Sequence, residues 1–282
     1  MKFTKMHGAG NDYVLLDARD MEADWSALAK SLCDRHMGVG ADGLLLVLPS
    51  ASADVRMRMY NPDGSEAEMC GNGIRCLAKY VIERDIVDRG KSPINIETMS
   101  GTRVLEPIWH DGKVERARVA MGGPELRSER VPVSLSEDMA GEPVLDYPID
   151  VDGTALDLTF VSMGNPHAVA FIESPVSMFP LHIIGPEMER HAIFPNKVNF
   201  SIVNVKEARW IVARVWERGV GETLACGTGA CAIAVASRLH GYTDDEVDIT
   251  LPGGVLTISW DGVGQVYLEG PVEEVFEGEL NI

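Results

Sequence analysis

The sequence predicts an α/β protein built from two similar lobes, each with strands arranged around one central helix. A four-residue motif occurs twice, as Cys70-Gly71-Asn72-Gly73 and as Cys226-Gly227-Thr228-Gly229. Each copy stands between a strand-like segment and a helix-like segment. The chain has 282 residues, of which 45% are hydrophobic, so it is long enough for about two domains with sizeable cores.

The two motif copies belong to a longer repeat. The same spacing in sequence that separates the two motif copies also separates Arg58 from Arg214 and Glu66 from Glu222. A slightly different spacing aligns Gly10-Asn11 with Gly164-Asn165. All the matches fall in the same order along the chain. Because the period is far too long for a solenoid, we interpret the two halves as copies of one duplicated unit.

Matching chain breakers stand at the ends of the two repeats. They are Gly122-Gly123-Pro124 and Gly270-Pro271. We therefore expect a first lobe at residues 1–122, completed by residues 271–282, and a second lobe at residues 123–270.

In the first lobe, apolar runs predict buried strands at 13–16 and 44–48, with a helix between them over the apolar stripe from Trp25 to Cys33. Alternation over 56–60 predicts a half-buried strand, and Asn61-Pro62-Asp63-Gly64 predicts a turn. A helix should begin near Gly71, because the apolar residues after it repeat at spacings of three and four. Strands are expected at 94–96 and 104–105.

The second lobe repeats this plan. It has predicted strands at 168–172, 203–205 and 211–216, with a short helix near 187–191. The segment after Cys226 is small or apolar on almost every side, which is typical of a helix surrounded by protein.

Composition and charge exclude several classes of protein. The formal net charge of -18 disfavours a protein that binds nucleic acid through clustered Lys and Arg. No run approaches the ~18 apolar residues expected of a membrane helix, and the first residues lack an apolar signal core. Five cysteines, an odd number, fit reduced thiols better than a disulfide framework, so the cytoplasm is the expected location.

The two motif cysteines are candidate reactive thiols. Gly-x-Gly after Cys70 and Cys226 lets backbone N–H groups approach a ligand, and a helix N-terminus stabilises negative charge and favours the thiolate. The alternative is a buried, inert cysteine followed by a glycine turn. Duplication with the same flanking glycines favours function.

The other cysteines, Cys33, Cys76 and Cys231, are predicted to be packing residues. The spacing from Cys70 to Cys76 is too wide for a structural zinc pair, and Cys226 with Cys231 would have to bind from within a helix, so no metal site is expected. Gly38 to Gly43 matches the dinucleotide pattern by letter, but it follows a helix and precedes a strand, which is the wrong context.

Two further polar residues are candidate catalytic groups near the thiols. Glu217 stands nine residues before Cys226, as Asn61 does before Cys70. His167 follows a tight glycine turn and is a candidate base toward a thiol. The alternatives are a surface ion pair of Glu217 with Arg218 and a structural loop histidine.

Together these segments resemble the diaminopimelate epimerase family over nearly the whole chain. The resemblance is carried by 8–12 (Gly-Ala-Gly-Asn-Asp), 69–73 (Met-Cys-Gly-Asn-Gly), 164–167 (Gly-Asn-Pro-His), 216–219 (Trp-Glu-Arg-Gly) and 225–229 (Ala-Cys-Gly-Thr-Gly). It implies two pseudo-symmetric lobes, each a mostly antiparallel sheet rolled around a central helix. It also implies an isomerase that interconverts LL- and meso-diaminopimelate for lysine and peptidoglycan, without pyridoxal phosphate or metal, as a homodimer.

By resemblance, Cys70 and Cys226 are the two acid/base thiols, and His167 and Glu217 assist proton exchange. The positions expected to hold the substrate are Asn11, Asn61, Gly71, Asn72, Asn165, Asn199, Glu217, Arg218, Gly227 and Thr228. At Gly43 the chain departs from members that carry a substrate-contacting glutamine there.

The chemistry explains why two thiols are needed. Inverting an α-carbon without redox chemistry means removing a proton from one face and returning another to the opposite face, while the carbanionic charge is stabilised on the carboxylate. Two alternatives stay open: a racemase of another amino acid, such as histidine, on the same fold, and a thiol redox or binding protein. The sequence leaves open which thiol acts on which stereoisomer.

Overall fold

The computed structural model describes residues 1–135 and 141–280. The chain forms two compact units, one of Met1–Ala120 with Glu269–Ile282 and one of Met121–Leu268. The chain leaves the first unit near the end of β8 (Lys113–Gly122) and returns to it within β17 (Val266–Pro271). The boundaries expected from the sequence, 122/123 and 270/271, lie two residues from these.

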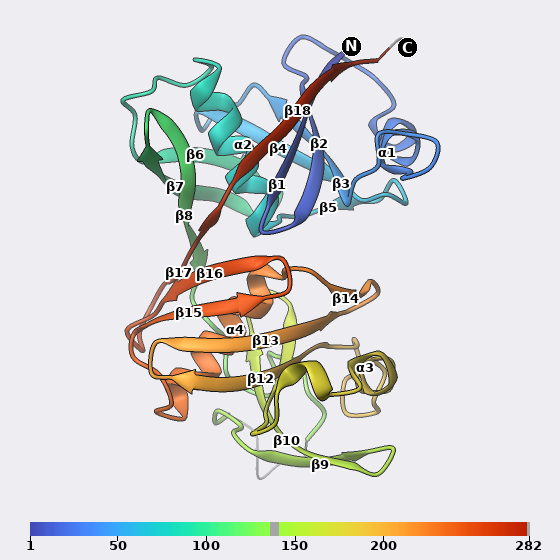
Figure 1. Cartoon of the computed structure of the whole chain (residues 1–282), viewed down its shortest axis with the longest axis vertical. Coiled ribbons are helices and arrows are strands. Elements are labelled where there is room, and N and C mark those ends of the chain that lie inside the picture. Colours follow the sequence, from blue (N-terminus) through green and yellow to red (C-terminus); the bar gives the residue numbers. More distant parts are fainter. Residues whose placement is uncertain (136–140, 281–282) are drawn as a thin grey trace. The chain divides into compact units, whose positions relative to one another are not determined.

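The first unit is a mostly antiparallel sheet around one helix (Figure 1). Two of its strand pairs are parallel, β2 with β3 and β4 with β6. Helix α2 contacts six of the strands from β1 to β7. The elements are β1 (Lys2–Gly8), β2 (Asn11–Asp17), α1 (Trp25–Cys33), β3 (Gly43–Leu48), β4 (Val55–Tyr60), β5 (Glu66–Ala67), α2 (Gly71–Glu83), β6 (Ile94–Thr98), β7 (Gly101–His110), β8 and β18 (Glu273–Glu279).

The second unit repeats the same pairing order, again with two parallel pairs, β11 with β12 and β13 with β15. Its β9 pairs with β10 as β18 pairs with β1 in the first unit. The elements are β9 (Tyr147–Val151), β10 (Thr154–Ser162), β11 (Pro166–Phe171), η2 (Val176–Met178), α3 (Leu181–Glu189), β12 (Asn199–Glu207), β13 (Trp210–Glu217), β14 (Gly221–Thr223), α4 (Gly227–Leu239), β15 (Glu246–Leu251) and β16 (Gly254–Ser259). The duplication seen in the sequence is therefore a duplication of topology.

The central helices are buried over nearly their whole length. In α2 the residues from Gly71 to Ile82 are all buried, and α4 is buried from Gly229 to Ser237. Fully burying an apolar side chain such as Ile74 or Leu77 contributes about 1.5–3 kcal/mol, so each helix is held mainly by its sheet. The predicted fold class is confirmed.

One predicted element is misplaced. The helix expected near 187–191 is α3 at Leu181–Glu189, with Gly185 and Pro186 inside it. A Cβ at Gly185 would meet the Trp216 ring at 2.5 Å, so packing against that ring, and not helix propensity, places this helix. Within the described ranges, no helix combines the length and apolar character needed to cross a membrane.

Candidate active site

Each motif cysteine caps the N-terminus of a central helix. Cys70 and Cys226 have extended backbones, with φ of -136° and -114°, and immediately precede α2 and α4. Their carbonyl oxygens accept the first helical hydrogen bonds, from Ile74 N and Ala230 N, both at 2.9 Å. Both sulfur atoms thus stand where the helix dipole and the first-turn amides favour negative charge.

Cys70 is partly buried, and β2 provides its polar neighbours. The Tyr13 hydroxyl lies 2.9 Å from Cys70 Sγ and also donates to Asn11 Oδ1, which in turn accepts from Asn72 Nδ2 at 3.2 Å. Asn11 Oδ1 lies 3.7 Å from the same sulfur. Burial raises the pKa of Tyr13 well above its usual range, and the neighbouring Cys70 raises it further, so this phenol stays protonated at neutral pH.

Arg75 is a fully buried charged residue one turn into α2. Its Nη1 donates to Gly71 O at 2.8 Å and its Nη2 to Asn72 Oδ1 at 2.9 Å. Burial lowers the pKa of this guanidinium, and the two oxygens to which it donates are uncharged. We did not predict this residue from the sequence, although an arginine between Ile74 and Cys76 on a buried helix is a visible signal.

Cys226 has a different environment. Its side chain is 4% exposed, and its sulfur accepts from Gly229 N at 3.3 Å and lies 3.6 Å from Thr228 Oγ1. Burial raises the pKa of this thiol well above its usual range, and the nearby Glu217 carboxylate raises it further. Glu217 itself accepts a hydrogen bond from Thr223 Oγ1. Cys226 is therefore a neutral thiol at neutral pH.

His167 is fully buried on β11 and is linked to the second motif through Asn165. Its Nε2 lies 3.0 Å from Asn165 Oδ1, and Asn165 Nδ2 donates to Thr228 Oγ1 at 3.3 Å. Burial, with a smaller effect of the Arg218 charge, lowers the pKa of His167 to about 3. The imidazole is thus neutral at neutral pH.

Of the other predicted site residues, Asn199 and Arg218 contact each other, whereas Asn61 lies in a separate turn. Asn199 is buried, donates to Pro166 O at 2.8 Å and accepts from Arg218 N at 2.9 Å. Arg218 has an exposed side chain whose Nη1 donates to Asn196 O at 3.0 Å. Asn61 lies in the turn after β4, where its Nδ2 donates to Ser65 Oγ at 3.0 Å.

The structure therefore joins some of the predicted residues by direct contacts within each unit. In the first unit the contacts join Asn11, Cys70 and Asn72. In the second unit they join Asn165, His167, Thr228 and Cys226. Asn61 instead bonds within its own turn.

The three remaining cysteines are buried and pack as predicted. Burial raises the pKa of Cys33 to about 11 and that of Cys76 to about 12, so neither is a reactive thiol near neutral pH. Among the described residues, no cluster of three or more His, Cys, Asp or Glu side chains has a geometry that could hold a metal ion.

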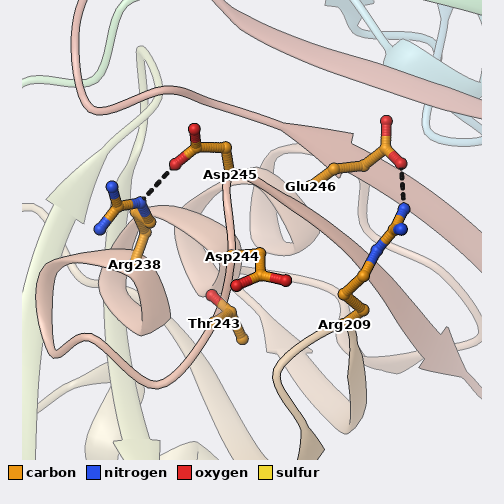
Figure 2. Close-up of a pocket in the computed structure, with 6 residues that line it drawn as sticks. All are labelled: Arg209, Arg238, Thr243, Asp244, Asp245 and Glu246. Carbon is orange, nitrogen blue, oxygen red and sulfur yellow. Dashed lines mark hydrogen bonds and ion pairs between the residues drawn. The ribbon is translucent and has the colours of Figure 1, made fainter.

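The second unit has a surface pocket lined by Arg209, Arg238, Thr243, Asp244, Asp245 and Glu246 (Figure 2). Arg238 stands in the last turn of α4, whereas Cys226 caps the first turn, and at 1.5 Å per residue these two residues are roughly 18 Å apart along the helix axis. Arg238 pairs with Asp245 at 2.7 Å, and Arg209 pairs with Glu246. Because both arginines already have carboxylate partners, we do not assign the pocket to the reaction.

Comparison with known proteins decides the family. The sequence profile of the diaminopimelate epimerase family matches residues 3–127 and 159–275. The chain belongs to the diaminopimelate epimerase family. This confirms the resemblance found in the sequence and the prediction of an isomerase.

Individual relatives agree over the full length. The chain is 47% identical to a diaminopimelate epimerase of Acetivibrio thermocellus, covering 100% of this chain and 99% of the relative. It is 50% identical to one of Methanococcus maripaludis, covering 100% of both.

Solved structures with low sequence identity support the fold alone. A PhzF-family phenazine biosynthesis protein of Bacillus anthracis superposes with a TM-score of 0.72 at 18% identity, covering 100% of this chain and 99% of that one. A probable proline racemase of Agrobacterium radiobacter gives 0.71 at 16% identity, covering 100% and 93%.

Proposed function

We propose that this protein interconverts LL- and meso-2,6-diaminopimelate by a cofactor-independent, two-base mechanism, in the formation of lysine and peptidoglycan precursors. The observation that carries the proposal is the pair of thiol-capped helices in a duplicated chain. Full-length relatives with close to half of their residues identical carry the name of this activity.

In this mechanism one cysteine acts as a thiolate and the other as a thiol. The thiolate takes the α-proton from one face of the substrate and becomes a thiol, while the other thiol returns its proton to the opposite face of the same carbon and becomes a thiolate. The reverse reaction exchanges these roles. Cys226 suits the acid role in the resting enzyme, because burial raises the pKa of its thiol.

The difficult step is the removal of a very weakly acidic α-proton. The charge that develops on the substrate carboxylate is stabilised by the first-turn amides of α2 and α4, at Gly71-Asn72 and Gly227-Thr228. Each well-aimed donor contributes ~10²-fold or more in rate. His167 and Glu217 assist proton exchange with the thiols.

The remaining predicted positions hold the polar groups of the substrate. They are Asn11, Asn61, Asn165, Asn199 and Arg218. The substrate has a second ammonium and carboxylate, so a set of amides with one arginine matches its chemistry.

The decisive experiment incubates the protein with a panel of amino acids in D2O and follows optical purity and α-deuterium by NMR. We expect inversion and α-labelling of diaminopimelate and of no other amino acid in the panel. Inversion of histidine or another amino acid instead would assign a racemase of that substrate, and an absence of α-labelling throughout would refute the epimerase.

Substitution separates the thiol mechanism from a redox role. Cys70→Ala and Cys226→Ala should each abolish inversion, whereas Cys76→Ala, which alters a packing cysteine, should retain it. A Cys70→Ala enzyme with wild-type activity would refute the two-base mechanism. Reversible formation of a disulfide between Cys70 and Cys226 as the protein's main activity would support the redox alternative.

We also infer a cytoplasmic homodimer. All five cysteines are free thiols in the structure, which fits a reducing compartment. Light scattering at several concentrations tests the dimer, and a monomer at micromolar concentration would contradict it.

A further inference from the structure

Tyr13 has the same position in the first unit that His167 has in the second. Each stands two residues after the asparagine of the repeated Gly-Asn pair, Asn11 or Asn165, and each bonds to the Oδ1 of that asparagine. Each is also the first paired residue of a parallel strand pair, since Tyr13 is opposite Gly43 and His167 is opposite Asn199. A phenol thus replaces an imidazole at equivalent positions of the two units.

The Tyr13 ring is buried next to the first turn of α2. The residue is 0% exposed. A Cβ at Gly43 would meet the Tyr13 ring at 3.4 Å and Tyr60 O at 3.0 Å, and a Cβ at Gly73 would also meet the ring at 3.4 Å. Both glycines therefore lie close to this ring, and the Tyr13 hydroxyl lies 2.9 Å from Cys70 Sγ.

We propose that the Tyr13 hydroxyl is a positioning residue that serves Cys70 in both of its protonation states. A hydroxyl carries one proton and two lone pairs, so it can accept from the thiol or donate to the thiolate. When Cys70 is a thiol, its S–H donates to Tyr13 Oη and the Tyr13 O–H donates to Asn11 Oδ1. When Cys70 is a thiolate, the O–H turns to the sulfur.

The rotation leaves no buried acceptor without a donor. Asn11 Oδ1 still accepts from Asn72 Nδ2 after the Tyr13 proton has turned away. The tyrosine never gives up its proton, in agreement with its raised pKa. The proton gained by Cys70 comes from the substrate, so the step is balanced by the exchange described above.

The test compares the wild type with Tyr13→Phe, which keeps the ring and removes only the hydroxyl. Tyr80→Phe, on the same unit near the end of α2, is the matched control. The rate of alkylation of Cys70 by iodoacetamide is measured by peptide mass spectrometry across pH 6–10 (roughly the range of thiol titration), without substrate.

The pH midpoint of Cys70 alkylation should rise by about one unit in Tyr13→Phe, because a hydrogen bond to a charged acceptor is lost. It should not move in Tyr80→Phe. The ionisable neighbours of Cys70 and Tyr13 include Arg75 and Cys76 on α2 and Asp42, and the substitution alters none of them. An unmoved midpoint in a folded Tyr13→Phe protein would overturn the proposal.

The role of Tyr13 deepens the proposed function, and the effect of Tyr13→Phe on turnover rests on that function. We expect kcat for diaminopimelate to fall at least tenfold in Tyr13→Phe with little change in KM, because the hydroxyl acts on the thiol and not on the substrate. If the alkylation midpoint of Cys70 does not move in Tyr13→Phe and the wild type epimerises diaminopimelate, the role of Tyr13 is refuted and the proposed function stands. If the midpoint moves in Tyr13→Phe but the wild type inverts no amino acid, the proposed function is refuted and the role of Tyr13 stands.

A measurement on the unaltered hydroxyl covers the case in which Tyr13→Phe does not fold. The infrared difference between the wild type and Cys70→Ser isolates the S–H stretch of Cys70. A band at lower frequency than that of a free thiol supports the contact with Tyr13, and a band at the frequency of a free thiol overturns it.

Discussion

Gly229→Ala should damage the reaction while leaving the protein stably folded. Gly229 lies in the first turn of α4, and its N–H donates to Cys226 Sγ at 3.3 Å. A Cβ at this position would stand 3.2 Å from that sulfur, 3.1 Å from Cys226 Cβ and 3.3 Å from Val215 Cγ1. Such contacts are tighter than ordinary van der Waals contact, so the sulfur must move by a few tenths of an ångström.

The expected loss follows from this displacement. Catalytic groups must be held within about 0.5 Å of the productive geometry, and a misplacement of about 1 Å costs on the order of 10²-fold in rate. We therefore expect kcat to fall by about 10- to 100-fold. Replacing glycine by alanine in a helix adds up to about 1 kcal/mol of stability, which offsets the strain, so the midpoint of thermal unfolding should change little.

Gly73→Ala is the matched control, because it is the same substitution at the equivalent position of α2. There a Cβ would meet the flexible end of Leu45 at 3.1 Å and the Tyr13 ring at 3.4 Å, which is an ordinary contact distance, and Cys70 Sγ is not among its three nearest contacts. We expect a several-fold smaller loss. Epimerisation kinetics and thermal unfolding of both variants test the reasoning, which fails if the two lose activity equally or if Gly229→Ala is as fast as the wild type.

Two further predictions concern ionisation. In the native protein near pH 8, iodoacetamide should label the partly buried Cys70 before Cys226, which is 4% exposed. It should spare Cys76, because burial raises the pKa of that thiol to about 12. Peptide mass spectrometry measures the order of labelling, and early labelling of Cys76 would contradict this prediction. His167 should make folding less stable in acid, because the unfolded chain takes up a proton near pH 6.5 that the buried ring, with its pKa of about 3, does not. The contribution of His167 to the free energy of unfolding is fully present above pH ~6.5. It is lost as the pH falls, by about 2 kcal/mol at pH ~5. Urea unfolding of the wild type should therefore lose more stability between pH ~7 and ~5 than that of His167→Asn, and equal losses would refute the assignment.

The sequence predicted the duplicated topology and the two thiol-capped helices because their signals are local. Glycines next to Cys70 and Cys226 mark a turn, and the apolar residues after them have helical spacing. The position of α3 escaped prediction because Gly185 and Pro186 interrupt its pattern and packing on Trp216 places it.

The contacts around the sulfur atoms could not be predicted from local patterns. Tyr13 was interpreted as part of a buried strand, and its contact with Cys70 depends on how β2 packs under α2, across 57 residues of sequence. Arg75 differs, because its partners Gly71 O and Asn72 Oδ1 lie four and three residues before it in the same helix, so a local pattern could have revealed it.

The two units keep one backbone arrangement and differ in the side chains that surround the sulfur. When the two copies of the repeat are aligned, the buried Arg75 of α2 corresponds to Cys231 of α4. At this position the first unit therefore has a guanidinium and the second unit has a thiol. In the second unit the Glu217 carboxylate stands near Cys226 and raises the pKa of its thiol. Two identical thiols would compete for the same protonation state, whereas a two-base inversion needs one base and one acid at the start of each turnover. Under the proposed two-base mechanism, the duplication supplies one sulfur atom on each half, and the surroundings of Cys226 favour its thiol form at the start of a turnover.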